Sequence, residues 1–199
     1  MNKQIILKNQ KIFTKNKLTE KVREWDPNRS KVAAGIKKGI MPNIKENDTV
    51  LYLGAAEGYT ISYISDILTK GKVYGIDISP YSMQKLLILS ENTENIIPIL
   101  GDCNKPFEYE KMISEKFDYI IQDIAQKNQA EILIKNADLF LKEKGLALLS
   151  LKLSAISQKN HKKTIDDQIN ILRNKFKIIN QKRLDPFEKN HMLILLEKK

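Results

Sequence analysis

The sequence predicts an α/β fold with an open, mostly parallel, seven-stranded sheet in which one strand is reversed at the end of the chain. Between residues 49 and 176, short apolar runs typical of buried strands alternate with amphipathic helical patterns, as in βαβ units. Two further apolar runs follow, with only a short polar loop between them. The 199 residues, 42% of them hydrophobic, suffice for one domain with a buried core.

Five parallel strands are predicted from runs rich in Val, Ile, Leu and Tyr. They lie at residues 49–54, 72–77, 96–100, 117–123 and 146–152. The intervening helices are predicted from side chains that recur at helical spacing. These are Ile61, Ile64 and Leu68; Met83, Leu86, Leu87 and Leu89; Ala130, Leu133, Ile134, Ala137 and Leu141; and Ile165, Gln168, Ile169, Leu172 and Phe176.

The last two strands, at residues 176–179 and 192–196, are predicted to form a hairpin. The segment between them, QKRLDPFEKN, has no room for a crossover helix, so the final strand must run antiparallel to its neighbours. This ending is typical of the Rossmann-like class I methyltransferases and fits a dinucleotide dehydrogenase poorly. At the other end, residues 1–24 are predicted to be a short β arm, and residues 25–199 the methyltransferase domain.

The stretch EWDPNRSKVAAG, residues 24–35, is predicted to lead into one more helix. Asn28 or Ser30 supplies its cap, and the small residues after Lys31 allow close packing on the sheet. Trp25, the only tryptophan, is expected to anchor the approach to this helix. Arg29 has two open interpretations, as an RNA-phosphate contact or as a member of a structural pair.

The composition favours a polyanionic partner. The formal charge is +10 and the pI about 9.5, as in nucleic-acid-binding domains, although only 4 of the 34 basic residues are arginine and lysine enrichment also follows from general composition. No apolar run is long enough to span a membrane, and the N-terminus lacks a secretion signal. With a single cysteine, Cys103, the chain suits a reducing cytoplasm.

The loop LGAAEGYT after the first parallel strand is predicted to approach a ligand closely. Gly54 and Gly58 allow the backbone to do so. The loop does not match the G-x-G-x-x-G fingerprint, because Ala56 and Tyr59 occupy the positions of its second and third glycines. Glu57 would place an anion beside a pyrophosphate, whereas a cationic sulfonium and ammonium tolerate it. The loop therefore favours S-adenosylmethionine.

Three successive strands end in an aspartate. Asp77 lies 19 residues after Gly58, the spacing at which an acid reaches a ribose diol in doubly wound folds. Asp102 follows the third strand, where it could receive an adenine amino group, and Asp123 ends the fourth. A single strand-end aspartate is usually a cap or turn residue, but three at one sheet edge favour a ligand site.

Together these motifs resemble fibrillarin, in particular its archaeal form. The resemblance rests on WDPNRSK, VLYLGAAEGYT, SDI, NIIPILGD, DIAQ, SLK and DPFEKNHMLI, in this order from Trp25 to the C-terminus. It implies an S-adenosylmethionine-dependent RNA ribose 2′-O-methyltransferase that acts on ribosomal RNA, and on transfer RNA in archaea, within a box C/D guide-RNA particle. The implied partners are guide and target RNA, a Nop-family scaffold protein and a kink-turn-binding ribosomal-type protein.

The resemblance also implies the site residues. Besides Gly54, which comes from the loop itself, the cofactor contacts are Tyr59, Thr60, Asp77, Ile78, Asp102, Cys103, Asp123, Ile124, Ala125 and Gln126. The catalytic set is Lys31, Asp123, Lys152 and His191. Cys103 is expected to pack beside the adenine, and no catalytic metal is predicted because the chain has no Cys/His cluster.

Methyl transfer to a ribose hydroxyl requires alignment of the reactants and removal of the hydroxyl proton. A lysine takes a proton only where burial or a neighbouring cation favours its neutral form. Lys152 is expected to accept the proton or steer the hydroxyl, with Lys31 as the neighbouring cation. Asp123 would orient Lys152, and Lys31 and His191 would support the geometry and bind substrate.

The sequence departs from the family in three respects: it has no Gly/Arg-rich tail, its region before Trp25 is short, and Glu57 and Tyr59 replace small or hydroxyl residues. Three other functions stay open at this point. One is a catalytically silent structural subunit of an RNA particle. A second is a methyltransferase for a protein side chain or a small molecule, and the least favoured is a cytosolic dehydrogenase.

Overall fold

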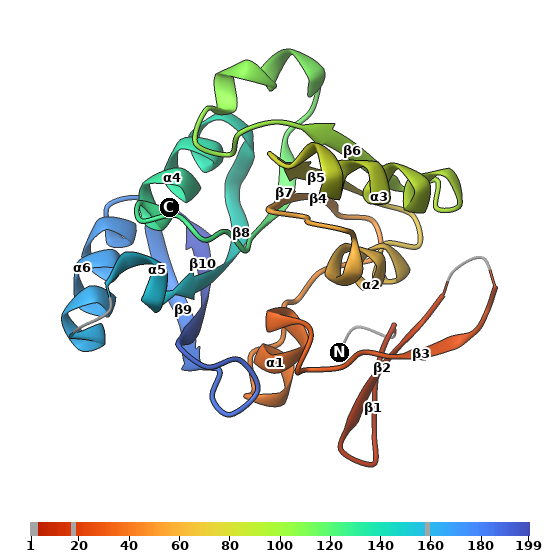
Figure 1. The fold of residues 1–199 in the computed structure, drawn as a ribbon, viewed down its shortest axis with the longest axis horizontal. Helices are drawn as coiled ribbons and strands as arrows, with labels where there is room; N and C mark the ends of the chain where they lie inside the picture. Colours follow the sequence, from red (N-terminus) through yellow and green to blue (C-terminus); the bar gives the residue numbers. More distant parts are fainter. Residues whose placement is uncertain (1–3, 17–18, 158–159) are drawn as a thin grey trace.

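In the computed structural model, which describes residues 4–16, 19–157 and 160–199, the predicted seven-stranded sheet is present in the order β6-β5-β4-β7-β8-β10-β9 (Figure 1). The strands are β4 (Thr49–Leu53), β5 (Lys72–Asp77), β6 (Ile96–Leu100), β7 (Phe117–Gln122), β8 (Leu141–Lys152), β9 (Phe176–Arg183) and β10 (His191–Lys198). The first five of these pair in parallel, as predicted.

The reversed strand is β10, which confirms the predicted hairpin. It runs antiparallel to β9 and also to β8, so it is inserted between them. In the β8–β10 ladder His191 lies directly opposite Lys152. Residues opposite each other in such a ladder project on the same face, so this register brings two predicted catalytic residues together.

Helices cover both faces of the sheet (Figure 1). They are α1 (Lys31–Lys37), α2 (Tyr59–Ile67), α3 (Pro80–Glu91), α4 (Gln129–Phe140), α5 (Leu153–Ile156) and α6 (His161–Arg173), with 3₁₀ turns at Pro106–Glu108 and Glu110–Met112. Apolar residues of α1, α2 and α3 form one core cluster, and those of α4, α5 and α6 form the other. Strand β4 contributes to both core clusters, because successive side chains of a strand point to opposite faces of the sheet. Val50 and Tyr52 belong to the first cluster, and Leu51 and Leu53 belong to the second.

Two helix ends differ from the prediction. Leu141 was expected to close the helical stripe of α4, but its backbone is extended and it begins β8, where it pairs with Phe117. Phe176 was placed both at the end of the last helical stripe and at the start of the strand 176–179; it begins β9, which confirms the strand and not the helix. Both side chains are buried, so helical spacing alone could not separate a helix's last apolar residue from a strand's first.

The N-terminal segment forms a three-stranded antiparallel sheet of β1 (Ile5–Lys8), β2 (Lys11–Lys15) and β3 (Val22–Glu24). It is fastened to α2 by Asp66, whose side chain is 2% exposed. Thr14 Oγ1 donates to Asp66 Oδ2 at 2.6 Å, and Arg23 donates to the same oxygen through Nη2 at 2.6 Å and Nε at 3.0 Å. A buried carboxylate thus joins this sheet to the domain.

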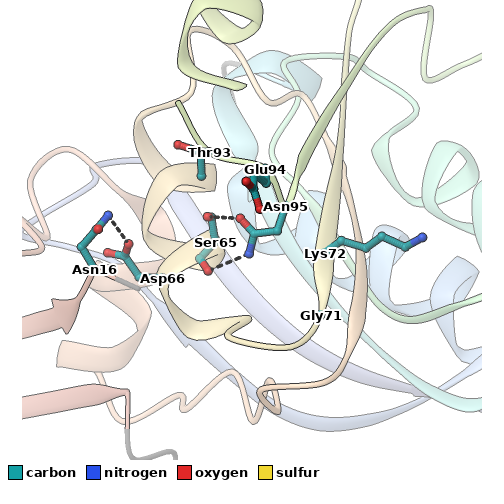
Figure 2. A pocket seen from close by; sticks show the side chains of 8 residues that line it. All are labelled: Asn16, Ser65, Asp66, Gly71, Lys72, Thr93, Glu94 and Asn95. Atoms are coloured by element: carbon teal, nitrogen blue, oxygen red, sulfur yellow. Dashed lines mark hydrogen bonds between the residues drawn. The ribbon is translucent and has the colours of Figure 1, made fainter. Parts of the chain in front are cut away.

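A pocket of about 280 Å³ lies beside this junction, next to the residues that begin β5 (Figure 2). Four of its polar side chains, those of Asn16, Ser65, Asp66 and Asn95, bond to one another or to the backbone. Asn16 Nδ2 donates to Asp66 Oδ1 at 3.1 Å, Ser65 Oγ donates to Asn95 Oδ1 at 2.6 Å, and Asn95 Nδ2 donates to the Ser65 carbonyl at 3.1 Å. These bonds join the turn after β2 to α2 and to the start of β6, which is a structural role.

Candidate active site

A second cavity, of about 220 Å³, opens at the carboxyl ends of β4, β5, β6 and β7. Nine of the eleven predicted cofactor residues line it: Gly54, Asp77, Ile78, Asp102, Cys103, Asp123, Ile124, Ala125 and Gln126. Ala56, Asn104 and Ile132 complete the lining and were not predicted. Ligands of open α/β sheets bind at this edge, so the strand-end aspartates meet where the chain order suggested.

Gly54 keeps the floor of this cavity open. Its φ is +83°, and a Cβ atom there would lie 2.3 Å from the Asp123 carbonyl oxygen and 2.8 Å from Ile124 Cγ2. The backbone of Asp123 is held next to it, because its N–H donates to the Leu53 carbonyl at 2.9 Å. Any larger residue at position 54 would therefore push apart the two loops that border the cavity.

The carboxylates of the cavity are oriented by backbone N–H groups. Asp77 accepts from Ala56 N at 2.8 Å through Oδ2 and from Ser79 N at 2.9 Å through Oδ1. Asp102 accepts from Asn104 N at 2.9 Å. Each oxygen keeps a further lone pair for a ligand. Fixed acceptors of this kind suit hydroxyl and amino donors such as those of a nucleoside.

Cys103 is a packed thiol. It is buried, and burial raises its pKa to about 12, so it stays protonated at neutral pH. The Cys103 carbonyl is also fixed, because Asn136 Nδ2 donates to it at 2.9 Å. These features agree with the expected packing role and give the thiol no nucleophilic character.

Tyr59 and Thr60, the other two predicted cofactor residues, lie on the first turn of α2 and outside the cavity lining given by the described residues. Thr60 Oγ1 donates to Ser30 Oγ at 3.1 Å. Glu57 also lies outside the lining, and its exposed carboxylate pairs with Lys85 Nζ at 2.6 Å. Because Glu57 lies outside the cavity lining, its negative charge does not select a cationic cofactor over a pyrophosphate, contrary to the expectation from sequence.

Lys31 and Asp123 form an ion pair at the cavity, with Nζ 3.2 Å from Oδ2. Lys31 reaches this place because Ser30 caps α1, its side chain accepting from Ala33 N. The helix packs tightly on β10, since a Cβ atom on Gly35 would lie 2.1 Å from Leu193 Cδ2. Helix α1 thus brings a residue from far upstream to Asp123, as the resemblance implied.

His191, which lies opposite Lys152 in the ladder, is close enough to Lys31 and Asp123 to feel their charges. Its Nδ1 is 2.9 Å from the Lys189 carbonyl oxygen, so Nδ1 carries the proton and Nε2 keeps a lone pair. Burial and then the charge of Lys31 lower the His191 pKa, while the bond to Lys189, Asp123 and Glu188 act in the opposite direction. His191 is therefore a neutral hydrogen-bond acceptor at pH 7.

We expect His191 to make stability depend on pH. Because its folded pKa is below the ordinary value of 6.5, the unfolded chain takes up a proton first as the pH falls. The His191→Gln variant lacks this proton uptake. Urea unfolding at about pH 7.5 and about pH 5.5 should therefore show wild type losing more stability on acidification than the variant. Equal losses of stability in wild type and variant would contradict a contribution of His191 to the pH dependence.

Glu188 was not predicted, yet it joins the cluster. Its Oε1 lies 3.8 Å from Lys31 Nζ and its Oε2 lies 3.9 Å from His191 Nδ1. The side chains of Lys31, Asp123 and Glu188 are between 19% and 25% exposed, so their interactions are only partly screened by water. In the sequence, Glu188 precedes the predicted catalytic His191 by three residues within DPFEKNH. This proximity is the one feature of the sequence that could have indicated Glu188.

Gln129 is a second unpredicted residue, and no sequence signal marked it. Its fully buried side chain accepts from Lys152 N at 2.8 Å and donates to the Lys152 carbonyl at 3.1 Å and to the Gln126 carbonyl at 2.7 Å. One carboxamide thus ties the backbone of Lys152 to the loop that borders the cavity. The Lys152 side chain starts from this fixed point, opposite His191.

We expect Gln129→Leu to reduce stability and activity together. Leucine fills a similar volume but leaves the Lys152 N–H and two carbonyls without their partner, at a cost of about 2–3 kcal/mol. Urea unfolding measures the stability. The methylation rate at saturating substrates shows whether a displaced Lys152 lowers the activity. Asn170→Leu, an exposed substitution on α6, serves as the control. An unchanged rate in a destabilised Gln129→Leu would limit Gln129 to a structural role.

The reversed β10 and the acid-lined cavity at the carboxyl edge define a class I S-adenosylmethionine-dependent methyltransferase. The model of one family, described as fibrillarin, matches residues 2–199. A fibrillarin-like rRNA/tRNA 2′-O-methyltransferase of Methanocaldococcus jannaschii is 45% identical, over 96% of this chain and 85% of the relative. The chain belongs to the fibrillarin family.

Two solved structures agree with this assignment. A fibrillarin in a complex with Nop5p superposes with a TM-score of 0.92 at 38% identity, over 98% of both chains. Aeropyrum pernix fibrillarin, solved with natively bound S-adenosylmethionine, superposes with a TM-score of 0.86 at 33% identity, over 96% of this chain and 92% of that one. Within the described residues, no helix is long and apolar enough to cross a membrane.

Proposed function

We propose that this protein transfers a methyl group from S-adenosylmethionine to the 2′-hydroxyl of ribose in ribosomal and transfer RNA. The observation that carries the proposal is the Lys31–Asp123 pair at the cavity, with His191 beside it and Lys152 opposite His191 in the ladder. The activity named for the M. jannaschii relative supports the choice of RNA ribose as acceptor.

The proposed assembly contains a Nop-family scaffold protein, a kink-turn-binding ribosomal-type protein and a guide RNA. The scaffold is supported by the solved complex of a fibrillarin with Nop5p. Target selection by a guide RNA agrees with the formal charge of +10, because phosphate contacts bind RNA without reading its sequence. We also propose that residues 25–199 form the methyltransferase domain and that residues 1–24 act as its β arm, in the cytoplasm.

The cavity residues fit S-adenosylmethionine. The open floor at Gly54 admits a ligand against the backbone, and the oriented carboxylates of Asp77 and Asp102 suit ribose hydroxyls and the adenine amino group. Tyr59, Thr60 and residues 123–126 would complete the binding site. When bound, the cofactor supplies an electrophilic methyl group on a sulfonium, which is a good leaving group. The protein therefore needs to align the acceptor and manage one proton.

Lys31, Asp123, Lys152 and His191 would perform that alignment. The ribose hydroxyl oxygen forms the new bond to carbon while its proton passes to a neighbouring acceptor. Lys152 would accept this proton or steer the hydroxyl, from the position that Gln129 holds. Asp123 would orient the ammonium of Lys31, with which it forms an ion pair, and neutral His191 would offer the lone pair of its Nε2. Glu188 adds a second carboxylate near Lys31, 3.8 Å from its Nζ.

The test is an incubation with radiolabelled S-adenosylmethionine and a target RNA, with and without the guide RNA, the scaffold and the kink-turn protein. Label at a ribose 2′-oxygen, resistant to protease and dependent on the guide, is the expected result. Label on protein would identify a protein methyltransferase instead. Stoichiometric binding of the cofactor without transfer in the complete particle would identify a silent structural subunit.

A further inference from the structure

Arg29 is an exposed cation held in a fixed place. Its guanidinium lies over the Tyr59 ring, with the central carbon 4.1 Å from the ring centroid. Tyr59 is itself supported, because its ring packs edge-on against Tyr63 at 5.3 Å. Tyr63 stacks on the buried ring of Trp25 at 5.1 Å and 4°. Stacking of this kind immobilises a planar guanidinium and leaves its N–H groups free to donate.

The other three arginines donate to side-chain acceptors. Arg23 donates to Asp66, Arg173 to Asn170 and Arg183 to Asp185. Within the described residues, the guanidinium of Arg29 has no carboxylate or amide partner. Its five N–H donors are thus oriented by the ring beneath them and available to an external acceptor. A surface arginine held in this way without an anion is suited to bind one.

The backbone around Arg29 places this cation beside the methyl-transfer site. Arg29 N donates to the Asp26 carbonyl at 3.2 Å, and Asp26 also accepts from Asn28 N at 2.9 Å, so the turn is closed. Two residues later Lys31 reaches Asp123 in the cavity wall. The hydrogen bond between Thr60 and Ser30 ties the same turn to the start of α2. Arg29 therefore lies in the turn that leads into α1, two residues before Lys31 and next to the start of α2.

We propose that Arg29 binds a phosphate of the RNA strand that carries the target ribose, and so sets the position of that ribose relative to Lys31 and Asp123. This inference rests on the proposed function. A phosphodiester is the acceptor that the planar fork of arginine matches best, through two parallel N–H···O bonds. A phosphate also lies next to every ribose in RNA, so a fixed cation beside the catalytic set meets one when the hydroxyl is in place.

The test uses the complete guide particle, carrying either the wild-type protein or Arg29→Ala. The target RNAs have one phosphate near the target ribose replaced by an uncharged methylphosphonate, one position at a time. The single-turnover methylation rate is measured below saturation with target. We expect Arg29→Ala to lower the rate on unmodified target about tenfold, the effect of one charge-assisted hydrogen bond. One methylphosphonate should slow the wild type equally and have no further effect on Arg29→Ala.

Two results would overturn the inference. The first is that the losses from Arg29→Ala and from the methylphosphonate multiply at every position, which would show no contact between them. The second is a loss of S-adenosylmethionine affinity in Arg29→Ala, measured by calorimetry, that accounts for the loss of rate. In that case Arg29 acts only through Tyr59.

Matched variants complete the design. Arg29→Lys keeps the charge without the planar fork and should recover only part of the rate. Arg173→Ala removes an exposed arginine on α6 and should leave the rate and the methylphosphonate pattern unchanged. If the wild-type particle does not methylate the unmodified target, the proposed function fails before any variant is compared. The two failures are therefore distinguishable.

Discussion

Lys152→Ala should lower the rate of ribose methylation by about 10²- to 10⁴-fold, the range of a lost general acid or base. The residue ends β8, and its backbone is held by Gln129 opposite His191, so its side chain has a fixed origin beside the cavity. Single-turnover methylation in the complete guide particle, with saturating cofactor and target, measures the effect. Calorimetry must show that the variant still binds S-adenosylmethionine.

Two further variants serve as controls for Lys152→Ala. Lys177→Ala removes an exposed lysine of β9 and should keep the wild-type rate. Lys152→Arg keeps the positive charge but cannot release a proton near neutral pH, so it separates proton acceptance from electrostatic steering. A Lys152→Ala protein that binds cofactor, assembles and retains the full rate would remove Lys152 from the catalytic set.

Asp66→Ala should lower the free energy of unfolding by about 3–5 kcal/mol, as expected when one partner of a buried ion pair is removed. The Asp66 carboxylate is 2% exposed and accepts from Thr14, Asn16 and Arg23. Without it the hydroxyl of Thr14 and the guanidinium of Arg23 lose their acceptor at the junction between the N-terminal sheet and α2. Urea unfolding measured at neutral pH gives the change.

The control for Asp66→Ala is Asp138→Ala. Asp138 pairs with Lys175 at 2.5 Å, but the two side chains are 48% and 37% exposed, so its loss should cost no more than about 1 kcal/mol. Equal effects of the two substitutions would show that the buried carboxylate is not a principal anchor of the N-terminal sheet.

The Asp66 junction also bears on the site. Helix α2 carries Asp66 near its end and begins with Tyr59 and Thr60, which contact Arg29 and Ser30. The N-terminal sheet continues directly into Trp25 and then into the turn before α1. Asp66 and the Trp25–Tyr63 stack therefore hold together the two segments that deliver Arg29 and Lys31.

Much of the fold followed from chain order alone. Apolar runs alternating with helical patterns require parallel strands, and a polar loop as short as QKRLDPFEKN requires a hairpin. The helical stripes were extended too far, to Leu141 and Phe176, although the strand that begins at Phe176 was also predicted; a buried leucine or phenylalanine satisfies helix and strand patterns equally. The N-terminal segment, predicted only as a short β arm, has three strands.

The candidate cofactor site could be predicted from the sequence for a geometric reason. Parallel strands end at one edge of a sheet, so Asp77, Asp102 and Asp123 had to gather there once the strands were recognised. Lys31 and His191 required the family resemblance, since no local pattern connects them to Asp123. The contribution of Glu57 was misjudged because its carboxylate lies outside the cavity lining and pairs with Lys85 on α3.

The sequence by itself therefore determined the type and order of the elements and the acids at the strand ends, because these depend on local periodicity and on chain direction. The tertiary structure decided which distant side chains meet. It placed β10 beside β8, so that His191 faces Lys152, and it brought Gln129 and Glu188 next to the proposed catalytic set. It also placed the guanidinium of Arg29 over the ring of Tyr59, with no carboxylate partner among the described residues. Such contacts join segments remote in the chain, and only their packing in three dimensions sets the distances between them.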